Sequence, residues 1–335
     1  MNTRHYPLFV LITIDTESFS TGHPDQHIWG RVAGGGEYGI GMIMDMLEKH
    51  GARGTFYLNV YEAERHGDEA IRAVIAELHG RGHDVQLHTH PRDKFGIDKL
   101  TRADVPRQQE ILAWGKAFIE TQTGVEVLAH RAGAFAANLN TITALGNAGI
   151  KVDASLSPAW FESHLAREVV SHNRPFILQN VLELPVTYYV QGRIGQREFK
   201  RLVDIEACSL RELKSIVRQA LKAKVSTLNF LMHSHTFVRH GSDNAALVKR
   251  FETMLDYLST HPEVQLSTTT RFYQDWQSGK VPENAGLPFV PYTGWWLTYL
   301  RAVESVSKGW KNTLAALLPP IMITLFAAFL FFLLS

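Results

Sequence analysis

Two pairs of side chains suited to metal and proton chemistry follow apolar segments of the chain. Asp15 and Glu17 come after one predicted strand, and His88 and His90 come after another. Residues two apart on an extended strand point to the same side, so each pair can act on one target. One carboxylate could bind a metal while the other accepts protons, although two ordinary charged residues at a strand end would look the same. Two imidazoles and one carboxylate leave an open position, as in catalytic zinc sites.

A second histidine pair has the same spacing. His233 and His235 follow the apolar segment 228–232, and a protonated imidazole there could donate a proton to a leaving group. The alternative is a histidine that only packs at the rim of the fold. Arg131 also follows a predicted strand, and Asp153 stands at the end of another, but an arginine there is more often an ion-pair partner, and an aspartate can simply cap a turn.

The first 277 residues alternate short β-rich segments with helical segments. The predicted strands are 8–14, 54–58, 84–87, 126–129, 151–154, 181–186, 228–232 and 264–267, and the predicted helices are 39–50, 68–81, 105–122, 139–148, 210–223 and 244–261. Alternating β and α segments predict an α/β fold with a mainly parallel sheet. About eight such units favour a distorted (β/α) barrel over an open sheet. Because the carboxyl ends of barrel strands share one face, the polar residues above are expected to converge there.

Composition narrows the class of protein. The 335 residues carry 34 basic and 33 acidic side chains, a formal net charge of +1, which excludes nucleic-acid binding driven by bulk charge. A hydrophobic content of 45% excludes a disordered chain. The single cysteine, Cys208, can form neither an intrachain disulfide nor a thiolate metal cluster, which is consistent with a reducing compartment.

The C-terminal end has the composition of a membrane span. Residues 313–334 contain no charged side chain, and as a helix they would measure roughly 33 Å against a hydrocarbon core of ~30 Å. Trp310 and Lys311 precede this run as interface anchors would. A buried core helix or an amphipathic surface helix is the alternative, but the segment has no polar face. Pro319 and Pro320 predict a kink or the start of the straight helix.

The chain is therefore expected to have three parts. Residues 1–277 form the catalytic barrel, 278–311 a Pro/Gly-rich linker with an interfacial aromatic segment, and 312–335 a single transmembrane helix. Basic residues precede the span and none follows it, so the positive-inside rule predicts a cytoplasmic barrel. The N-terminus lacks the pattern of a signal peptide, in agreement with this orientation.

Five motifs, taken in chain order, resemble those of the polysaccharide deacetylase family (carbohydrate esterase family four), which includes chitooligosaccharide and peptidoglycan deacetylases. They are TIDTE, GHDVQLHTHP, HRAGAF, Asp153–Ser155 (DAS) and Leu231–His233 (LMH). The segment ARGTFYL is also similar to the second strand of that family. The resemblance spans about residues 8–270, and its order and spacing are more specific than any single motif.

The resemblance implies a distorted (β/α) barrel that uses a divalent ion, with Zn²⁺ expected, to remove an N- or O-acyl group such as acetyl or formyl from a sugar. The saccharide could be lipid-linked or a polysaccharide precursor. The site residues that the resemblance implies are Asp15 as general base, Glu17, His88 and His90 as metal ligands, Arg131 as the residue that orients Asp15, His233 as general acid, and Asp153 as a residue that helps to hold His233.

The chain departs from the family at several positions, which indicates a divergent member with a His-X-His-Pro motif. Many members have Asp in place of Glu17, and many place the second histidine four residues on, where this chain has Arg92. Whether both His88 and His90 bind the ion, and whether His233 or His235 is the acid, stays open. The alternative functions are a metallophosphoesterase or amidohydrolase and a non-catalytic saccharide-binding barrel.

Overall fold

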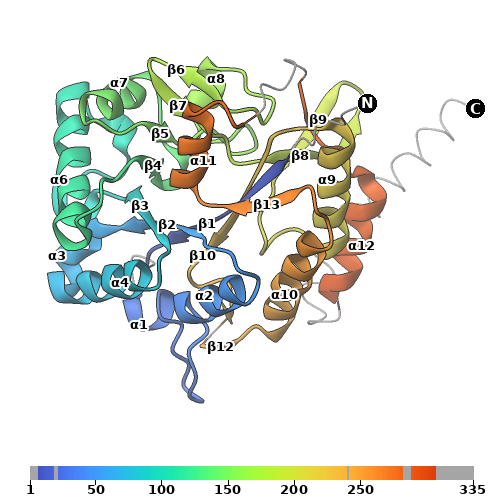
Figure 1. The fold of residues 1–335 in the computed structure, drawn as a ribbon, viewed down its shortest axis with the longest axis horizontal. Helices are drawn as coiled ribbons and strands as arrows, with labels where there is room; N and C mark the ends of the chain where they lie inside the picture. Colours follow the sequence, from blue (N-terminus) through green and yellow to red (C-terminus); the bar gives the residue numbers. More distant parts are fainter. Residues whose placement is uncertain (1–6, 19–21, 240, 282–287, 307–335) are drawn as a thin grey trace, which may run out of the picture.

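The structure is a computed structural model that describes residues 7–18, 22–239, 241–281 and 288–306. A curved, mainly parallel sheet of nine strands runs in the order β10-β1-β2-β3-β4-β5-β7-β6, with β13 paired to β1. Helices surround it (Figure 1). The strands are β1 Leu8–Thr16, β2 Thr55–Asn59, β3 Asp84–Thr89, β4 Ala129–Ala132, β5 Val152–Asp153, β6 Phe176–Leu178, β7 Val181–Glu183, β10 Thr227–His233 and β13 Val264–Ser267. This arrangement confirms the predicted α/β class.

Six helices cover the sheet, within three residues of the predicted ranges. They are α2 Ile40–Lys49, α4 Asp68–Gly80, α6 Val105–Thr123, α7 Leu139–Asn147, α9 Leu210–Ala223 and α10 Ala245–Ser259. Side chains cap their first turns: Asn138 and Ser209 form capping boxes at α7 and α9, and Asp104 caps α6. The four-residue helices are α1 Pro24–His27, α3 Ala63–His66, α5 Arg92–Phe95 and α8 Leu165–Glu168, and the 3₁₀ turns are Val60–Glu62, Leu100–Arg102 and Gly133–Phe135.

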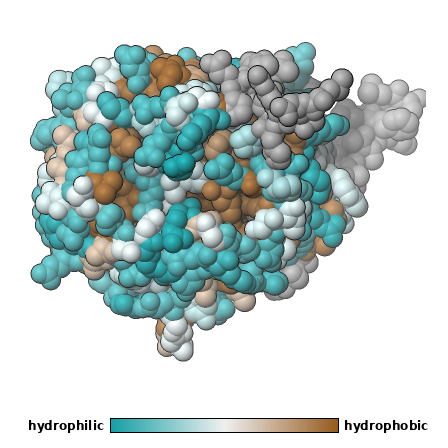
Figure 2. Space-filling model, viewed as in Figure 1, coloured by the Kyte–Doolittle hydropathy of each residue, from teal (hydrophilic) through white to brown (hydrophobic). Residues whose placement is uncertain are grey.

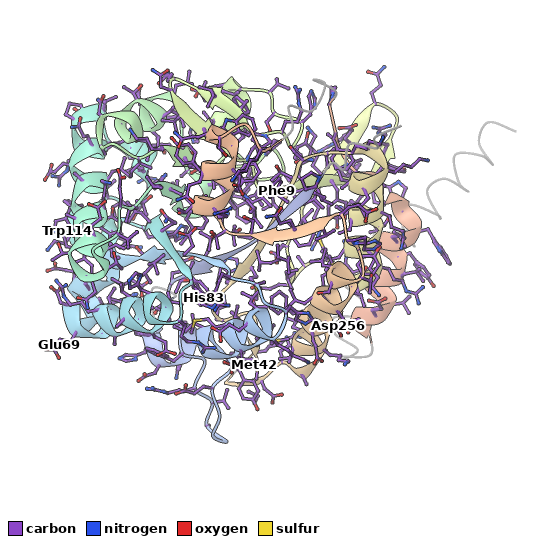
Figure 3. The ribbon with its side chains drawn as sticks, viewed as in Figure 1. Phe9, Met42, Glu69, His83, Trp114 and Asp256 are labelled. Carbon is purple, nitrogen blue, oxygen red and sulfur yellow. The ribbon has the colours of Figure 1, made fainter. Side chains whose placement is uncertain are left out.

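Strand β1 is buried over its whole length, and its two faces serve different purposes. On one face, the apolar side chains pack against the surrounding helices, and they are Leu8, Val10, Ile12 and Ile14. Phe9, which is labelled in Figure 3, and Leu11 point into the barrel. Phe9 meets Phe272 edge-to-face with ring centroids 5.5 Å apart. The strand alternation continues this inward face to Asp15. An apolar floor therefore lies beneath the predicted general base.

The barrel is incomplete between β7 and β10, where no strand ladder connects the two. Thr187 N–H instead donates to Asn229 O at 3.0 Å, and Asn229 N–H donates to Thr187 Oγ1 at 2.8 Å. Val203 O accepts from Leu231 N–H at 3.0 Å. Asp204, the residue after Val203, forms an isolated β-bridge with Leu231. These local bonds join the two sides without a ladder, so the structure shows a curved α/β half-barrel.

One strand starts later than expected. The prediction placed it at 126–129, but β4 covers Ala129–Ala132. Side chains take the preceding amides: Glu120 Oε1 accepts from Val127 N–H, and Gln86 Oε1 accepts from Leu128 and Ala129 N–H. Because these amides are satisfied outside the ladder, the strand begins downstream and includes Arg131 within its paired residues.

Several elements had no counterpart in the sequence analysis. They include the hairpin β8 Tyr188–Ile194 with β9 Arg197–Leu202, the small pair β11 Val238–Arg239 and β12 Ser242–Asp243, and helices α11 Thr269–Gln277 and α12 Gly294–Val306. Helix α12 lies within the predicted linker and is fastened to the barrel, since Arg301 Nη1 donates to Glu212 Oε1 at 2.6 Å. Trp295 packs on Gly192, where a Cβ would lie 2.2 Å from its ring. Part of residues 278–311 is therefore a docked helix.

No helix among the described residues is long and apolar enough to cross a membrane. The predicted transmembrane helix, 312–335, lies outside the described residues, which end at 306. The face of the molecule seen in Figure 2 is largely hydrophilic, with small hydrophobic areas between polar side chains.

Candidate active site

The pairing of the strands brings the predicted site residues to one edge of the sheet. Asp15 lies opposite His233 of β10, and His88 of β3 lies opposite Arg131 of β4. These are the carboxyl-terminal ends of parallel strands. These four predicted residues, more than 200 positions apart at the extremes, therefore share one end of the barrel with Glu17 and His90, which directly follow β1 and β3.

Asp15 is held by a fully buried arginine. Arg131 Nη1 donates to Asp15 Oδ1 at 2.6 Å, and Nη2 donates to Thr13 Oγ1 at 2.8 Å. Arg131 Nε donates to Ala154 O at 3.2 Å, and its guanidinium lies 4.2 Å from the centre of the Tyr57 ring. These contacts leave the guanidinium one orientation, so it fixes the position of the Asp15 carboxylate.

Glu17 meets both histidines of the second motif. Its Oε2 lies 2.9 Å from His90 Nε2 and 3.7 Å from His88 Nε2. Gly133 makes room for His90, because a Cβ on this glycine would lie 2.3 Å from His90 Nε2. The HRAGAF motif thus contributes both the arginine for Asp15 and the space for an imidazole. The three ligand atoms lie within 4.8 Å of one another, close enough to hold one ion.

The protonation of His88 suits a metal ligand. Its Nδ1 lies 2.9 Å from Arg131 O, a pure acceptor, so Nδ1 carries the hydrogen and Nε2 carries the lone pair. That Nε2 is buried and has no hydrogen-bond partner. Burial alone would raise the pKa of Glu17, but the charge of His90 and its hydrogen bond to the carboxylate hold that pKa well below its usual range. Two imidazoles and an ionised carboxylate fit a divalent ion such as zinc.

Two residues that the sequence analysis did not identify lie behind these ligands. Glu62 Oε1 accepts from Ser18 N–H at 2.7 Å and from Asn59 Nδ2 at 3.0 Å. Asn59 Oδ1 in turn accepts from His90 N–H at 3.3 Å. Glu62 and Asn59 therefore connect the residue after Glu17 to the backbone of His90, and they fix the spacing between two of the three ligands.

His233 is paired with a carboxylate from a loop. Its Nδ1 lies 3.1 Å from Glu206 Oε1. Burial lowers the pKa of His233, but the hydrogen bond and the charge of Glu206, helped by Asp15 and Asp204, raise it to about 10. Burial and the charge of His233 lower the pKa of His235 to about 4. At neutral pH, therefore, His233 carries a proton to donate and His235 does not.

The structure does not place Asp153 beside His233, so this part of the prediction is wrong. Asp153 is fully buried on β5, where its Oδ1 accepts from Ser155 Oγ at 2.7 Å and lies 2.8 Å from His130 Nδ1. The described hydrogen bonds of Asp153 are thus with His130 and Ser155, whereas His233 is bonded to Glu206. Ser155 Oγ also accepts from Ala132 N–H, so Asp153 supports the strand that carries Arg131.

Glu206 takes the place that the prediction gave to Asp153. The segment Asp204-Ile-Glu206 repeats the acidic i, i+2 spacing of Asp15-Thr-Glu17, which was the available signal. It follows the unpredicted hairpin rather than a predicted strand. The acidic spacing could have marked Glu206 as a candidate site residue, but no predicted strand placed Glu206 near His233.

A second group of side chains is close enough to hold an ion. Glu206, His233 and His235 also have ligand atoms within 4.8 Å of one another. The ion pair between Glu206 and His233 favours protonation of this imidazole, which opposes metal binding. The first group has the unprotonated, buried Nε2 of His88. The trio Glu17, His88 and His90 is therefore the better metal site.

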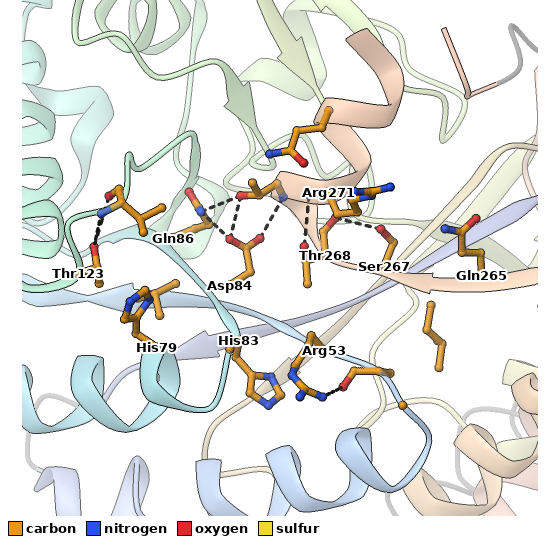
Figure 4. A pocket seen from close by; sticks show the side chains of 18 residues that line it. Arg53, His79, His83, Asp84, Gln86, Thr123, Gln265, Ser267, Thr268 and Arg271 are labelled. Carbon is orange, nitrogen blue, oxygen red and sulfur yellow. Dashed lines mark hydrogen bonds between the residues drawn. The ribbon is translucent and has the colours of Figure 1, made fainter. Parts of the chain in front are cut away.

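A cavity of about 480 Å³ lies at the opposite end of the barrel (Figure 4). The loops before β2 and β3 and the turn from β13 into α11 line it. Asp84, at its centre, accepts hydrogen bonds from Thr270 N–H and Oγ1, Gln86 Nε2 and Thr55 Oγ1. These polar groups hold α11 over the end of the barrel, and they share no residue with the candidate active site.

Comparison with known proteins agrees with this geometry. The family model for polysaccharide deacetylase matches residues 39–152, the segment that contains His88, His90 and Arg131. A protein from Mycobacterium smegmatis assigned to the polysaccharide deacetylases shares the fold, with a TM-score of 0.58 and 16% identity over 85% of this chain and 95% of that one. A comparison with curated proteins gives no match.

Two further solved structures are similar over most of their length. Peptidoglycan deacetylase PdaC from Bacillus subtilis has a TM-score of 0.42 and 14% identity, over 82% of this chain and 95% of that one. The Xyl-CE4 domain of a multidomain xylanase from the hindgut metagenome of Trinervitermes trinervoides has a TM-score of 0.44 and 14% identity, over 86% and 97%. The family model matches residues 39–152, and this match confirms the resemblance to the polysaccharide deacetylases that the ordered motifs indicate.

Proposed function

We propose that this protein is a carbohydrate deacetylase that hydrolyses an N- or O-acyl group, acetyl or formyl, on a sugar. The observation that carries the proposal is the convergence of an oriented carboxylate, a metal-compatible trio and a protonated histidine on one barrel edge. An amide or ester needs these three functions for hydrolysis without a covalent intermediate.

Glu17, His88 and His90 would hold the ion, for which we propose Zn²⁺. When bound, a divalent ion supplies Lewis-acid polarisation of the acyl carbonyl and of a water molecule. Asp15 then accepts a proton from the attacking water as the new bond to the acyl carbon forms. Arg131 keeps the Asp15 carboxylate aimed at that water.

His233 is the proposed general acid, which protonates the leaving group. As the bond from the acyl carbon to nitrogen or oxygen breaks, His233 donates its proton to the departing atom. The products are a carboxylic acid and the free amine or hydroxyl of the sugar. Glu206 keeps His233 charged before each turnover, and the low pKa of His235 argues against it as the acid.

The chain is further proposed to be anchored in a membrane by residues 312–335, with the barrel in the cytoplasm. The support is the uncharged run 313–334 and the basic residues before it. Trp296 and Tyr299 on α12 are exposed and stack 5.6 Å apart, as suits residues at a bilayer surface. Sedimentation of the full-length protein with membranes after a carbonate wash is expected, and complete release would contradict the anchor.

The test of activity uses full-length protein in detergent with Zn²⁺. A panel of N-acetyl, N-formyl and O-acetyl sugars, free and lipid-linked, is incubated with the protein, and the released acid is identified by mass. Acetate or formate should appear with the unaltered protein and not with Asp15→Asn. Release of phosphate from phosphorylated sugars would favour a phosphoesterase. Sugar binding without any release would favour a non-catalytic barrel.

A further inference from the structure

One face of helix α12 leaves apolar and aromatic side chains in water. Trp296, Tyr299 and Val303 lie at positions i, i+3 and i+7, which share one face of a helix, and all three are exposed. The helix is fastened to the barrel by other residues, since Arg301 Nη2 donates to Gln191 Oε1 at 2.9 Å. Grouped apolar side chains left in water commonly mark an interaction surface.

The tip of the hairpin formed by β8 and β9 extends this surface. Trp295 joins the two elements, because its ring packs on Gly192 and its Nε1 donates to Arg193 O at 3.1 Å. Phe199 of β9 meets the same ring edge-to-face, with ring centroids 5.3 Å apart. Ile194, at the end of β8, is exposed beside this junction. We define the α12–hairpin face by its exposed apolar side chains, which are Ile194, Trp296, Tyr299 and Val303.

The hairpin adds positive charge to this face. Residues 188–202 contain four basic side chains and one acidic side chain, which gives a net charge of +3. The acidic one, Glu198, pairs with Arg193 at 2.8 Å. Arg197 and Lys200 lie over aromatic rings and have no carboxylate partner among the described residues. The face therefore combines apolar side chains with basic ones whose charge is not neutralised.

The place where the chain leaves α12 indicates what lies against this face. The helix ends at Val306 and the uncharged run begins at Thr313, so the seven Cα-to-Cα steps between them span at most ~25 Å. A membrane span at 313–334 would hold the end of α12 within that distance of the bilayer. Trp and Tyr favour the headgroup level of a bilayer, and basic side chains are attracted to its anionic lipids. Position and chemistry thus fit the same partner.

We propose that the α12–hairpin face docks on the surface of a bilayer that contains anionic lipids and so holds the barrel in one orientation on the membrane. This inference goes beyond the membrane anchor proposed above and rests on it for the position of the face. Ile194, Trp296 and Tyr299 enter the headgroup region, and Arg197 and Lys200 contact anionic headgroups. An anchor joined only by a tether would leave the barrel free to turn, and it would not respond to the charge of the lipid.

The experiment places a fluorescent probe on the face of the full-length protein. Ile194→Cys carries an environment-sensitive dye as the one accessible thiol, because the single native cysteine, Cys208, is buried. The protein is reconstituted in nanodiscs of phosphatidylcholine with and without phosphatidylglycerol. A lipid-borne quencher should reduce the emission at least about threefold more in the anionic discs. Most of this difference should disappear at about 1 M salt, where the screening length falls to about 3 Å.

The matched control carries the dye at Val125→Cys. Val125 is exposed to the same degree, 53% against 50% for Ile194, and it follows α6, which lies across the barrel from α12 (Figure 1). This probe should not respond to anionic lipid.

Two pairs of substitutions test the chemistry of the face. Arg197→Gln with Lys200→Gln should reduce the quenching of the Ile194→Cys probe in anionic discs by at least about threefold, because it removes two charges from the contact. Trp296→Ala with Tyr299→Ala should have a similar effect in the same discs. The unfolding transition of both variants should stay unchanged, since these side chains lie on the surface.

Co-elution of the protein with the discs measures the anchor separately from the face. Co-elution without quenching of the Ile194→Cys probe would overturn the face and leave the anchor in place. Equal quenching in the two lipids, or at both probe positions, would overturn the anionic contact. A protein that does not co-elute contradicts the anchor, and quenching by added phosphatidylglycerol vesicles then decides the face by itself. Emission that follows protein concentration rather than lipid would assign the face to a second copy of the chain instead.

Discussion

Two ion pairs on opposite sides of the site carry the proposed proton transfers, and their environments differ. Arg131 and Asp15 form a buried pair, with side chains 0% and 7% exposed. Glu206 and His233 form a pair with side chains 30% and 27% exposed. Desolvation makes the loss of one partner costly in the first pair, whereas water can replace a partner in the second. The Arg131–Asp15 pair therefore holds the proposed base in a fixed position, and the Glu206–His233 pair raises the pKa of the proposed acid.

The largest effect is expected at the proposed zinc ligands Glu17, His88 and His90, which lie next to the Arg131–Asp15 pair. His88→Ala should remove the ligand whose Nε2 has no other partner, so both bound zinc and activity should fall to near background. Elemental analysis of the purified protein measures the metal, and acid release measures the activity. His235→Ala is the matched control from the second metal-compatible group, and it should keep one equivalent of zinc.

If His88→Ala and His90→Ala each keep one equivalent of zinc and His235→Ala loses it, the ion is bound by Glu206, His233 and His235 instead. The roles of the two sides would then have to be exchanged. The result also decides whether both histidines of the His-X-His-Pro motif bind the ion, since a residue that only supports the site would lower affinity without abolishing binding.

Asp15→Asn should give the next largest effect. Asparagine matches the shape of aspartate but cannot accept the proton, so kcat should fall by roughly 10²–10⁴-fold while zinc content stays near normal. The substitution also leaves the buried Arg131 charge without its counter-charge, and unfolding should become easier by about 1–3 kcal/mol. Denaturant titration measures this loss. A normal rate in Asp15→Asn would show that Asp15 is not the general base. Unchanged stability would show that the buried Arg131–Asp15 pair depends on its partner no more than the exposed pair does.

Glu206→Gln tests the exposed pair. Glu206 raises the pKa of His233 to about 10, so the acid is charged below that pH and loses its proton above it. Without the carboxylate the pKa should fall toward the usual 6.5, and activity at pH 8 should drop by at least about tenfold. The rate should recover as the pH is lowered through 7. Stability should change by less than about 1 kcal/mol, because both side chains are partly exposed.

The alkaline limb of the pH–rate profile gives the clearest reading of this variant. A limb that stays in place in Glu206→Gln would mean that His233 is not the titrating acid. His235→Ala should leave the limb unchanged, because burial and the charge of His233 already keep His235 neutral above about pH 4. A shift in His235→Ala instead would identify the other histidine as the acid.

Residues on long strands were predictable and their loop partners were not. Asp15 and Arg131 each come after an apolar run that predicts a strand, and this position put both at the carboxyl edge of the sheet. Glu206 and Glu62 reach the site from an unpredicted loop and a 3₁₀ turn, where no periodic pattern indicates direction. The prediction that Asp153 holds His233 was wrong for a related reason. The two-residue strand β5 fixes the place of Asp153 in the sheet but does not indicate which neighbouring side chain it contacts.

The smallest expected effect concerns the support behind the metal trio. Burial raises the pKa of Glu62 to about 7, and its Oε1 accepts from Ser18 N–H and Asn59 Nδ2. Glu62→Ala should release both donors, loosen the distance between Glu17 and His90, and weaken zinc affinity by roughly 10–100-fold. Glu62→Gln keeps an acceptor oxygen and should restore most of that affinity. Competition with a zinc chelator measures both, and kcat at saturating zinc should change little. Equal losses in the two variants would show that the charge of Glu62, rather than its hydrogen bonds, supports the metal side.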